Sequence, residues 1–302
     1  MTRQEEIIQK ITQKIDSAID SFNDSIPEIQ KEIDSQIRLL IKELDLNGKN
    51  IKNSVQNIRL LVKMRNKIES IVLNDKYKEQ VKQFADTFNN ISTLQNLYFS
   101  SLEKRFVPSK ILAAIKEDAI SATVRSLTEG GINANLTTGI EDILRTYIRS
   151  GGEYVELVDK MKTFITGTKD VPGYLTRYAK QITIDSLQQY NAAYNHAISS
   201  DLDYEWYMYI GSNITTTREF CSRMTAKKYF HKSEIPKILK GHIGDFKVKI
   251  NPKTELWYGA YEDTSAKNFN DRRGGYQCRH QIYAVSATMV PIEIKHALLE
   301  CC

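Results

Sequence analysis

Residues 7–22 read IIQKITQKIDSAIDSF and carry the dominant pattern of the chain. Apolar side chains recur in this stretch at alternating steps of three and four residues. They are Ile8, Ile11, Ile15, Ala18 and Phe22. Because an α-helix turns once every ~3.6 residues, this spacing gathers them on one helical face. We therefore predict that the chain opens with an amphipathic helix.

The helical pattern extends over the N-terminal two-thirds of the chain. The segment Asp24–Pro27 is expected to end the first helix and to begin another, since proline is favoured in the first turn of a helix. Residues 46–50, LNGKN, predict a helix stop followed by a turn. The helix after that turn is expected to pack through a single apolar face. That face consists of Ile51, Val55, Ile58, Val62 and Ile68.

At Asp203 the pattern changes from helical to mixed. Residues 204–210, YEWYMYI, are aromatic and predict a strand. Further strands are expected at 247–250, 256–258 and 281–285. The predicted fold class is mainly α, with long amphipathic helices in the N-terminal two-thirds and a small C-terminal α+β module. The predicted parts are a long-helix hairpin or coiled-coil region at 1–107, a helical body at 108–202 and the small α+β module at 203–302.

The composition is that of an ordinary globular protein. The chain has 302 residues, of which 41% are hydrophobic and 26% are charged, and its formal net charge is +5. No apolar run approaches the ~18 residues of a membrane span, and the first residues lack the apolar core of a signal peptide. We therefore expect a protein without a membrane partner, made in a cytosol. Its four cysteines are too few for a secreted disulfide scaffold.

Two polar blocks in the last third contain the candidate functional residues. The first is TREFCSR at 217–223, after the aromatic strand that contains Trp206, and the second is RRGGYQCRH at 272–280. A catalytic set is hard to assemble from them, because no cysteine has the sequence context of a nucleophile and the glycine pair lacks a phosphate-binding frame. We therefore expect no catalytic residues and no enzyme activity.

Three interpretations of these blocks remain open. In the first, Cys278 and His280 join Cys221 and either His231 or His242 in the mixed Cys/His set that zinc accepts. In the second, Cys221 and Cys278 form a bridge or a buried pair of thiols.

The third interpretation, which we prefer, is structural and requires no cofactor. Arginines hydrogen-bond to loop carbonyls and to carboxylates such as Glu219 and Asp271, while the glycines supply special backbone conformations. The residues of this structural motif are Trp206, Arg218, Cys221, Arg273, Gly274, Gly275, Cys278, Arg279 and His280.

The region between the two blocks is basic. From residue 218 to residue 280, lysine and arginine are about twice as frequent as aspartate and glutamate, and aromatic residues lie among them. This composition is compatible with contact to a nucleic-acid backbone, and equally with a solvated basic surface. The candidate contacts are Lys227, Lys228, Arg272 and Arg273.

In their order, these features resemble the Mu F-like minor head proteins of tailed phages, the phage head morphogenesis family. The shared order is a helix with polar and small residues, an aromatic strand with Trp206, the Arg218-x-x-Cys221 block, the Gly275-x-x-Cys278-Arg279-His280 block and a final strand. The resemblance covers residues 174–290. The first block has one cysteine where many family members have a CxxC pair, and this difference weakens the zinc interpretation.

The resemblance implies a low-copy virion protein of the capsid interior or portal region, assembled in the host cytoplasm. Its implied partners are the portal protein, the major capsid protein or both, together with packaged double-stranded DNA. It would act in head assembly, with a further role in genome packaging or ejection. The alternative is an effector enzyme delivered by the phage, a nuclease or ADP-ribosyltransferase-like protein, that unites His280 and Arg279 with a carboxylate.

Overall fold

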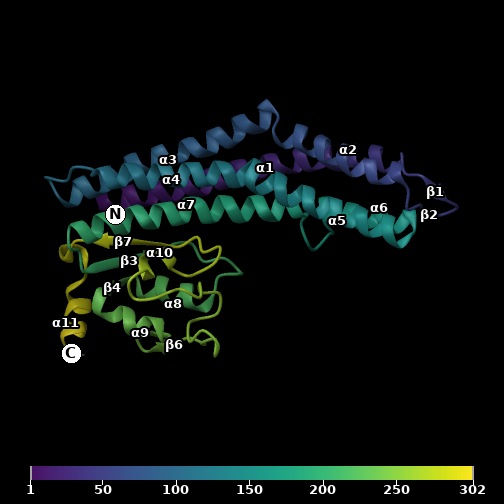
Figure 1. Cartoon of the computed structure of the whole chain (residues 1–302). Coiled ribbons are helices and arrows are strands. Elements are labelled where there is room, and N and C mark those ends of the chain that lie inside the picture. The colour runs from purple at the N-terminus through teal and green to yellow at the C-terminus, as the bar shows by residue number, and fades with distance from the viewer. Residues whose placement is uncertain (1, 301–302) are drawn as a thin grey trace. The chain divides into compact units, whose positions relative to one another are not determined.

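The computed structural model describes residues 2–300, and it confirms a mainly α protein with small C-terminal α+β elements (Figure 1). No helix in this range combines the length and the apolar character that a membrane span needs. The helices are α1 (Arg3–Ile41), α2 (Val55–Val72), α3 (Asp75–Leu102), α4 (Lys110–Leu127), α5 (Ala134–Ser150), α6 (Tyr154–Thr166), α7 (Tyr174–Asp201), α8 (Glu219–Lys227), α9 (Ile235–Leu239), α10 (Phe269–Arg272) and α11 (Ile292–Glu300). The strands are β1 (Leu46–Asn47), β2 (Asn50–Ile51), β3 (Trp206–Ile210), β4 (Tyr229–His231), β5 (His242–Ile243), β6 (Phe246–Lys247) and β7 (Gln281–Val285).

The chain divides into two compact units, each assembled from segments far apart in the sequence. Unit 1 contains Met1–Asp16, Phe88–Ala119 and Ile184–Cys302, and unit 2 contains Ser17–Thr87 and Ile120–Thr183. The boundaries fall inside the helices α1, α3, α4 and α7. The sequence predicts three parts divided after residues 107 and 202. Whether these parts fold independently stays a prediction.

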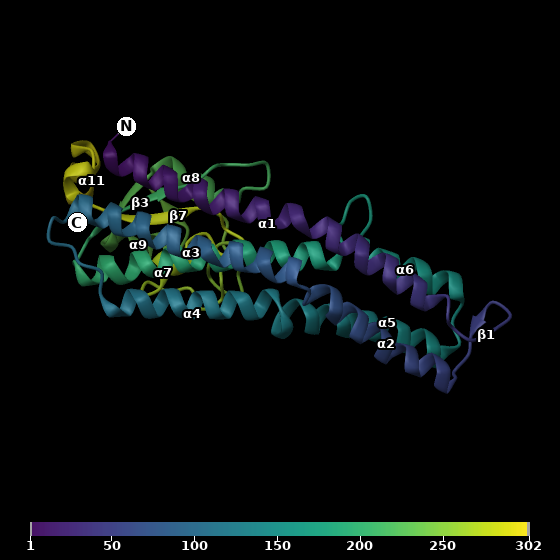
Figure 2. The ribbon, with the colours of Figure 1, turned by 90° about the horizontal axis from the view of Figure 1, so that it is seen from above.

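The expected helix break at Pro27 is wrong, because α1 continues through it without interruption (Figure 2). The Ser25 hydroxyl donates a hydrogen bond to the Phe22 carbonyl at 2.7 Å, inside the turn that precedes the proline. A proline within a helix costs about 3 kcal/mol. Ile26 and Ile33 on either side are fully buried, and burying one such side chain contributes about 1.5–3 kcal/mol. Burial of the apolar face therefore offsets the local cost.

The apolar face predicted for α2 is also largely wrong. Val55, Ile58 and Val62 are 66%, 51% and 55% exposed, although Ile51 and Ile68 are buried as expected. The helix has a second apolar row, and that row faces the interior of unit 2, where α2 packs most extensively on α5. The buried side chains of the second row are Leu60, Leu61, Met64, Ile68, Ile71 and Val72.

The main sheet of unit 1 has three antiparallel strands in the order β4-β3-β7. Strand β7 coincides with the predicted strand at 281–285. The predicted strands at 247–250 and 256–258 are replaced by the short β6 and by an isolated bridge between Ile250 and Trp257. Side chains alternate across the sheet, so its two faces meet different helices.

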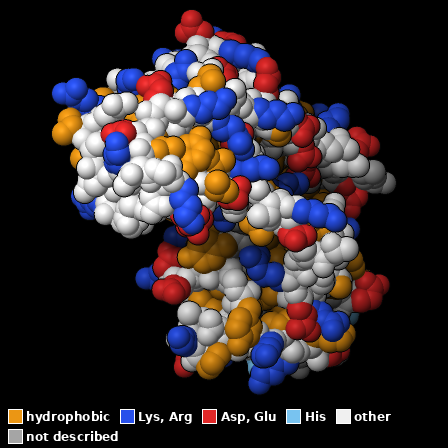
Figure 3. Space-filling view, turned by 90° about the vertical axis from the view of Figure 1, so that its right-hand side faces the viewer, with side chains coloured by type: hydrophobic (Ala, Val, Ile, Leu, Met, Phe, Trp, Pro, Cys, Tyr) orange, Lys and Arg blue, Asp and Glu red, His pale blue; other side chains and the backbone are white. Residues whose placement is uncertain are grey.

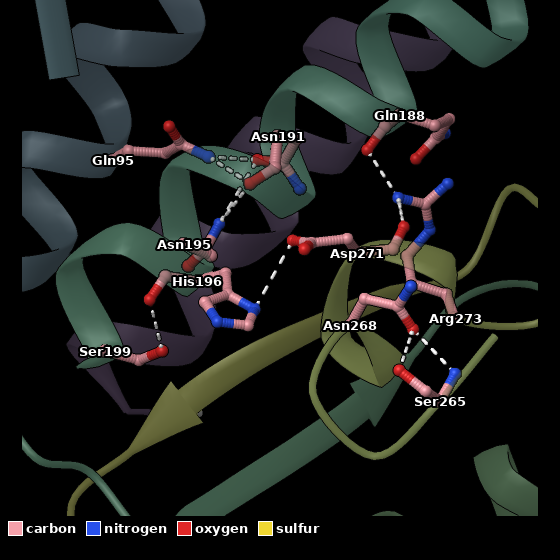
Figure 4. A network of polar contacts seen from close by, with 10 residues as sticks. All are labelled: Gln95, Gln188, Asn191, Asn195, His196, Ser199, Ser265, Asn268, Asp271 and Arg273. Atoms are coloured by element: carbon pink, nitrogen blue, oxygen red, sulfur yellow. Dashed lines mark hydrogen bonds and ion pairs between the residues drawn. The ribbon is translucent and has the colours of Figure 1, made fainter. Parts of the chain in front are cut away.

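One face of this sheet packs on helical segments of unit 1 through a buried polar network. The Tyr98 hydroxyl on α3 donates to the Ala284 carbonyl at 2.6 Å, and its ring meets that of Tyr283. Gln95 of α3 donates to the Asn191 carbonyl of α7 at 3.0 Å (Figure 4). Asn191 in turn donates to the Gln281 side chain on β7. Because these groups are fully buried, their mutual hydrogen bonds fix how α3, α7 and β7 meet.

Candidate functional site

The two sequence blocks meet at the other face of the sheet, between β3 and α8. Arg218 occupies the N-cap position of α8, so Cys221 lies in the first turn of this helix. The second block forms a tight turn between α10 and β7, and it places Cys278 and His280 just before the last strand. Tyr209 of β3 contacts both cysteines from the sheet. Residues 57 positions apart in the sequence therefore share one site.

Two cysteines and one histidine form a buried cluster. The Sγ atoms of Cys221 and Cys278 lie 3.8 Å apart, and Nδ1 of His280 lies 3.7 Å from the Cys278 sulfur. The Tyr209 hydroxyl donates to the Cys221 sulfur at 3.4 Å and lies 3.7 Å from the Cys278 sulfur. Cys221, Cys278 and His280 are only 2%, 3% and 5% exposed. Both cysteines are free, so the structure shows a buried pair of thiols.

The two thiols differ in acidity. The hydrogen bond from Cys221 lowers the pKa of Cys278 well below its ordinary value against the opposing effect of burial, and His280 and Arg273 lower it further. The same interaction with Cys278, reinforced by burial, raises the pKa of Cys221. Cys278 is therefore the first of the two to become a thiolate.

Gly274 and Gly275 allow the turn to lie against the cluster. A Cβ atom on Gly274 would lie 2.4 Å and 2.6 Å from the sulfurs of Cys221 and Cys278. Gly275 has φ +93°, and a Cβ there would lie 1.9 Å from the Gly259 carbonyl oxygen. Both positions therefore require glycine, one for space beside the sulfurs and the other for space and backbone conformation.

The carbonyl of Gly274 anchors the turn to two side chains. Arg218 donates to it at 3.3 Å and to the Tyr276 carbonyl at 2.5 Å. The indole Nε1 of Trp257 donates to the same Gly274 carbonyl at 3.1 Å. The Trp257 ring stacks on Phe220 of α8, with 3.7 Å between ring centroids. These contacts hold the start of α8 against the turn.

Arg273 is buried beneath the turn. Its Nη1 atom donates to the Gln188 carbonyl of α7 at 2.7 Å and to the Asp271 carbonyl at 3.0 Å (Figure 4). Main-chain carbonyls thus accept the hydrogen bonds of the Arg273 guanidinium, which is the role that the structural interpretation gives to arginine. Arg273 is 1% exposed, so it offers no contact to a nucleic acid in this structure.

The other predicted residues lie around this centre. Trp206 is at the far end of β3, where its ring packs edge-on against His231. His231 Nε2 lies 3.5 Å from the Glu205 carboxylate, and the one cluster of three or more potential metal donors among the described residues does not include it. Arg279 lies 3.9 Å from Asp16. His231 is therefore not brought to the sulfurs.

The remaining basic candidates each lie beside a carboxylate. Lys227 pairs with Glu234 at 2.8 Å and Lys228 with Glu5 at 3.4 Å. Arg272 pairs with Asp263. On the face seen in Figure 3, basic and acidic side chains are interspersed. Contact of Lys227, Lys228 and Arg272 with nucleic acid stays a prediction.

The sequence did not indicate Tyr209, Phe220 or Trp257 as parts of the site. Tyr209 belonged to a strand predicted only as packing, and Trp257 lies in a stretch expected to be a strand of its own. A weak signal existed for Tyr209, since alternation along β3 places every second side chain on one face. No signal located Trp257, because its contact with Phe220 depends on how the intervening 36 residues fold.

An ion pair beside the site makes stability depend on pH. His196 Nδ1 on α7 lies 3.5 Å from the Asp271 carboxylate, and this interaction raises the pKa of His196 above 6.5 against partial burial (Figure 4). Because the folded-state pKa is raised, the stabilisation is fully present below about pH 6.5 and is lost as pH rises through the raised value.

We therefore expect His196→Gln to cost more unfolding free energy at about pH 5.5 than at about pH 8.5. The difference should stay below about 1 kcal/mol, because the two side chains are 30% and 35% exposed and solvent screens the pair. Urea unfolding at the two pH values measures it. The exposed His242 provides the control, since His242→Gln should show no such difference. An equal loss at both pH values would exclude the ion pair as the cause.

The chain matches no protein-family model, no curated protein and no solved structure. The likeness to Mu F-like proteins therefore rests on the identity and order of the motif residues alone.

Proposed function

We propose that the chain is a structural minor head protein of a tailed bacteriophage. It would reside in the capsid interior or portal region and act in head assembly, with a further role in packaging or ejection of the genome. Its partners would be the portal protein, the major capsid protein or both. The sequence supports the proposal through the order of the motif residues. The structure supports it through the burial of these residues and their hydrogen bonds to main-chain carbonyls.

The observation that carries the proposal is the enclosure of the motif. Cys221, Cys278, His280 and Arg273 are buried, and the hydrogen-bonded partners of Arg218 and Arg273 are main-chain carbonyls. A substrate could not reach these side chains without opening the fold, whereas a structural element needs such enclosure. Of the carboxylates near the motif, Asp271 lies beside His196, and His280 lies against the Cys278 sulfur.

Mass spectrometry of purified virions tests the proposal. The protein should be present in few copies per particle, and its absence from particles would contradict the assignment. A His280→Ala variant separates the structural role from an effector enzyme. If the role is structural, the variant should impair particle assembly, and no activity on DNA or host protein should be lost. If the variant loses such an activity while particles assemble normally, the effector enzyme is favoured.

A docking surface for the portal or shell is provided by the exposed aliphatic row of α2. Val55, Ile58 and Val62 lie at steps of three and four residues, so they form one apolar stripe on the helix. Exposed stripes of this kind are typical of protein–protein contacts.

We expect Ile58→Glu to lower the copy number in virions several-fold while leaving the free energy of unfolding within about 0.5 kcal/mol of wild type. Because Ile58 is half exposed, the substitution opens no buried core. Quantitative mass spectrometry of particles and urea unfolding of the purified protein give the two readouts. The exposed Lys67, on the opposite side of α2, provides the control variant Lys67→Glu, which should be incorporated normally. Normal incorporation of Ile58→Glu would remove α2 from the docking surface.

A further inference from the structure

The donor atoms of the cysteine–histidine cluster have the mutual distances of a tetrahedral metal site. With Zn–S bonds of about 2.3 Å and Zn–N bonds of about 2.0–2.1 Å, tetrahedral angles place two sulfurs about 3.8 Å apart and a sulfur and a nitrogen about 3.6 Å apart. The observed Cys221–Cys278 distance is 3.8 Å and the Cys278–His280 distance is 3.7 Å. All three donor atoms lie within 4.8 Å of one another.

These donors are held in place by separate elements of the fold. Cys221 is fixed by α8, which Arg218 ties to the turn through the Gly274 carbonyl. Cys278 and His280 are fixed by that turn and by the start of β7. The His280 ring stacks on Tyr209 with 5.5 Å between centroids. The site therefore exists before any ion arrives, and binding would require little rearrangement.

The surroundings also suit a thiolate-bound cation. The Tyr209 hydroxyl lies 3.4 Å and 3.7 Å from the sulfurs of Cys221 and Cys278, so it is a fourth polar group beside the three donor atoms. Side chains bury the whole group, so water competes weakly for the metal.

We propose that Cys221, Cys278 and His280 bind one zinc ion, with the Tyr209 hydroxyl beside the fourth coordination position. Two Zn–S bonds and one Zn–N bond form, and the protons of the thiols pass to solvent. No electron is transferred. The ion would link α8 to the turn before β7, and it would stabilise the module whether or not the chain is a head protein. A missing CxxC in the first block does not prevent this, because the second sulfur comes from the other block.

A disulfide is the competing fate of the same two sulfurs. It would have to shorten the Sγ–Sγ distance from 3.8 Å to about 2.05 Å and would need an oxidant. Zinc needs neither. Reducing conditions therefore separate the two, since they preserve a zinc site and abolish a disulfide.

The test is the zinc content of the full chain, purified under reducing conditions and measured by inductively coupled plasma mass spectrometry. We expect one zinc per chain in the wild type, its loss in Cys221→Ser and Cys278→Ser, and its retention in His242→Ala, which removes an exposed histidine outside the cluster. Wild-type protein that remains metal-free after zinc is supplied would overturn the proposal, as would a Cys278→Ser variant that keeps its zinc.

Cobalt substitution keeps the proposal testable if the serine variants fail to fold. Wild-type protein is stripped with a chelator under reducing conditions and then given Co²⁺. Thiolate-to-cobalt charge-transfer bands together with the intense visible absorption of tetrahedral cobalt are expected. The spectrum of hydrated cobalt alone would refute the site.

Discussion

Gly275→Ala is expected to destabilise unit 1 by roughly 2–5 kcal/mol, the largest effect of any single methyl group that we anticipate in this chain. The residue has φ +93°, where a side chain costs roughly 1–2 kcal/mol. The added Cβ would lie 1.9 Å from the Gly259 carbonyl oxygen and 2.8 Å from the Ala260 Cα. Because both neighbours are main chain, relief requires a backbone shift, and such overpacking costs another 1–3 kcal/mol or so.

Urea unfolding followed by tryptophan fluorescence measures this loss, since Trp206 and Trp257 both belong to unit 1. Gly244→Ala is the matched control. Gly244 has φ +57° but nothing within 4 Å of its added Cβ, so its loss should be limited to the backbone cost of roughly 1–2 kcal/mol. Equal losses in the two variants would show that the contact with Gly259 does not constrain the turn.

Trp257→Ala is expected to lower the free energy of unfolding by about 3–5 kcal/mol, as large-to-small substitutions of buried aromatic residues do. The indole is buried, stacks on Phe220 and donates to the Gly274 carbonyl. Its removal leaves a cavity beside α8 and takes one of two donors from that carbonyl. Near-ultraviolet circular dichroism during urea unfolding gives the measurement.

The neighbouring residue provides the control for this variant. Tyr258 is 48% exposed, so Tyr258→Ala should cost less than about 1 kcal/mol. Trp257→Phe should fall between the two, because it keeps an aromatic ring on Phe220 but leaves the Gly274 carbonyl with Arg218 alone. A loss in Trp257→Ala no larger than that in Tyr258→Ala would mean that the stack does not hold the module together.

Local periodicity predicted which segments are helices much better than which faces they bury. Residues 8–22 repeat with a clear period and form part of α1. In α2 two apolar rows compete, and only the packing on α5 decides that Leu60, Leu61 and Met64 are buried while Val55 and Ile58 are exposed. Pro27 was misjudged for a related reason, since a local rule was outweighed by burial along the whole helix.

The site was predictable in its residue types but not in its geometry. Cys221, Cys278 and His280 were singled out together, yet the sequence contained nothing to exclude His231 or His242 as a further member of the set. That exclusion comes from strand pairing: His280, just before β7, stacks on Tyr209 of β3, whereas the pairing of β3 with β4 places His231 opposite Trp206. Helix α8, which begins in the first block, was also not recognised, because its nine residues are too few to show a period.

The hydrogen bond from Tyr98 to Ala284 has a consequence for synthesis, since its two ends are 186 residues apart. At elongation rates of about 5–20 residues per second, Tyr98 leaves the ribosome roughly 10–40 s before its partner strand does. During that interval the face of α3 that contains Tyr98 lacks β7, whose Ala284 and Tyr283 contact this side chain in the folded protein. Contacts this distant in sequence also close slowly once both ends exist. Nascent chains of this protein should therefore depend on chaperones that shield the exposed face until β7 has been made.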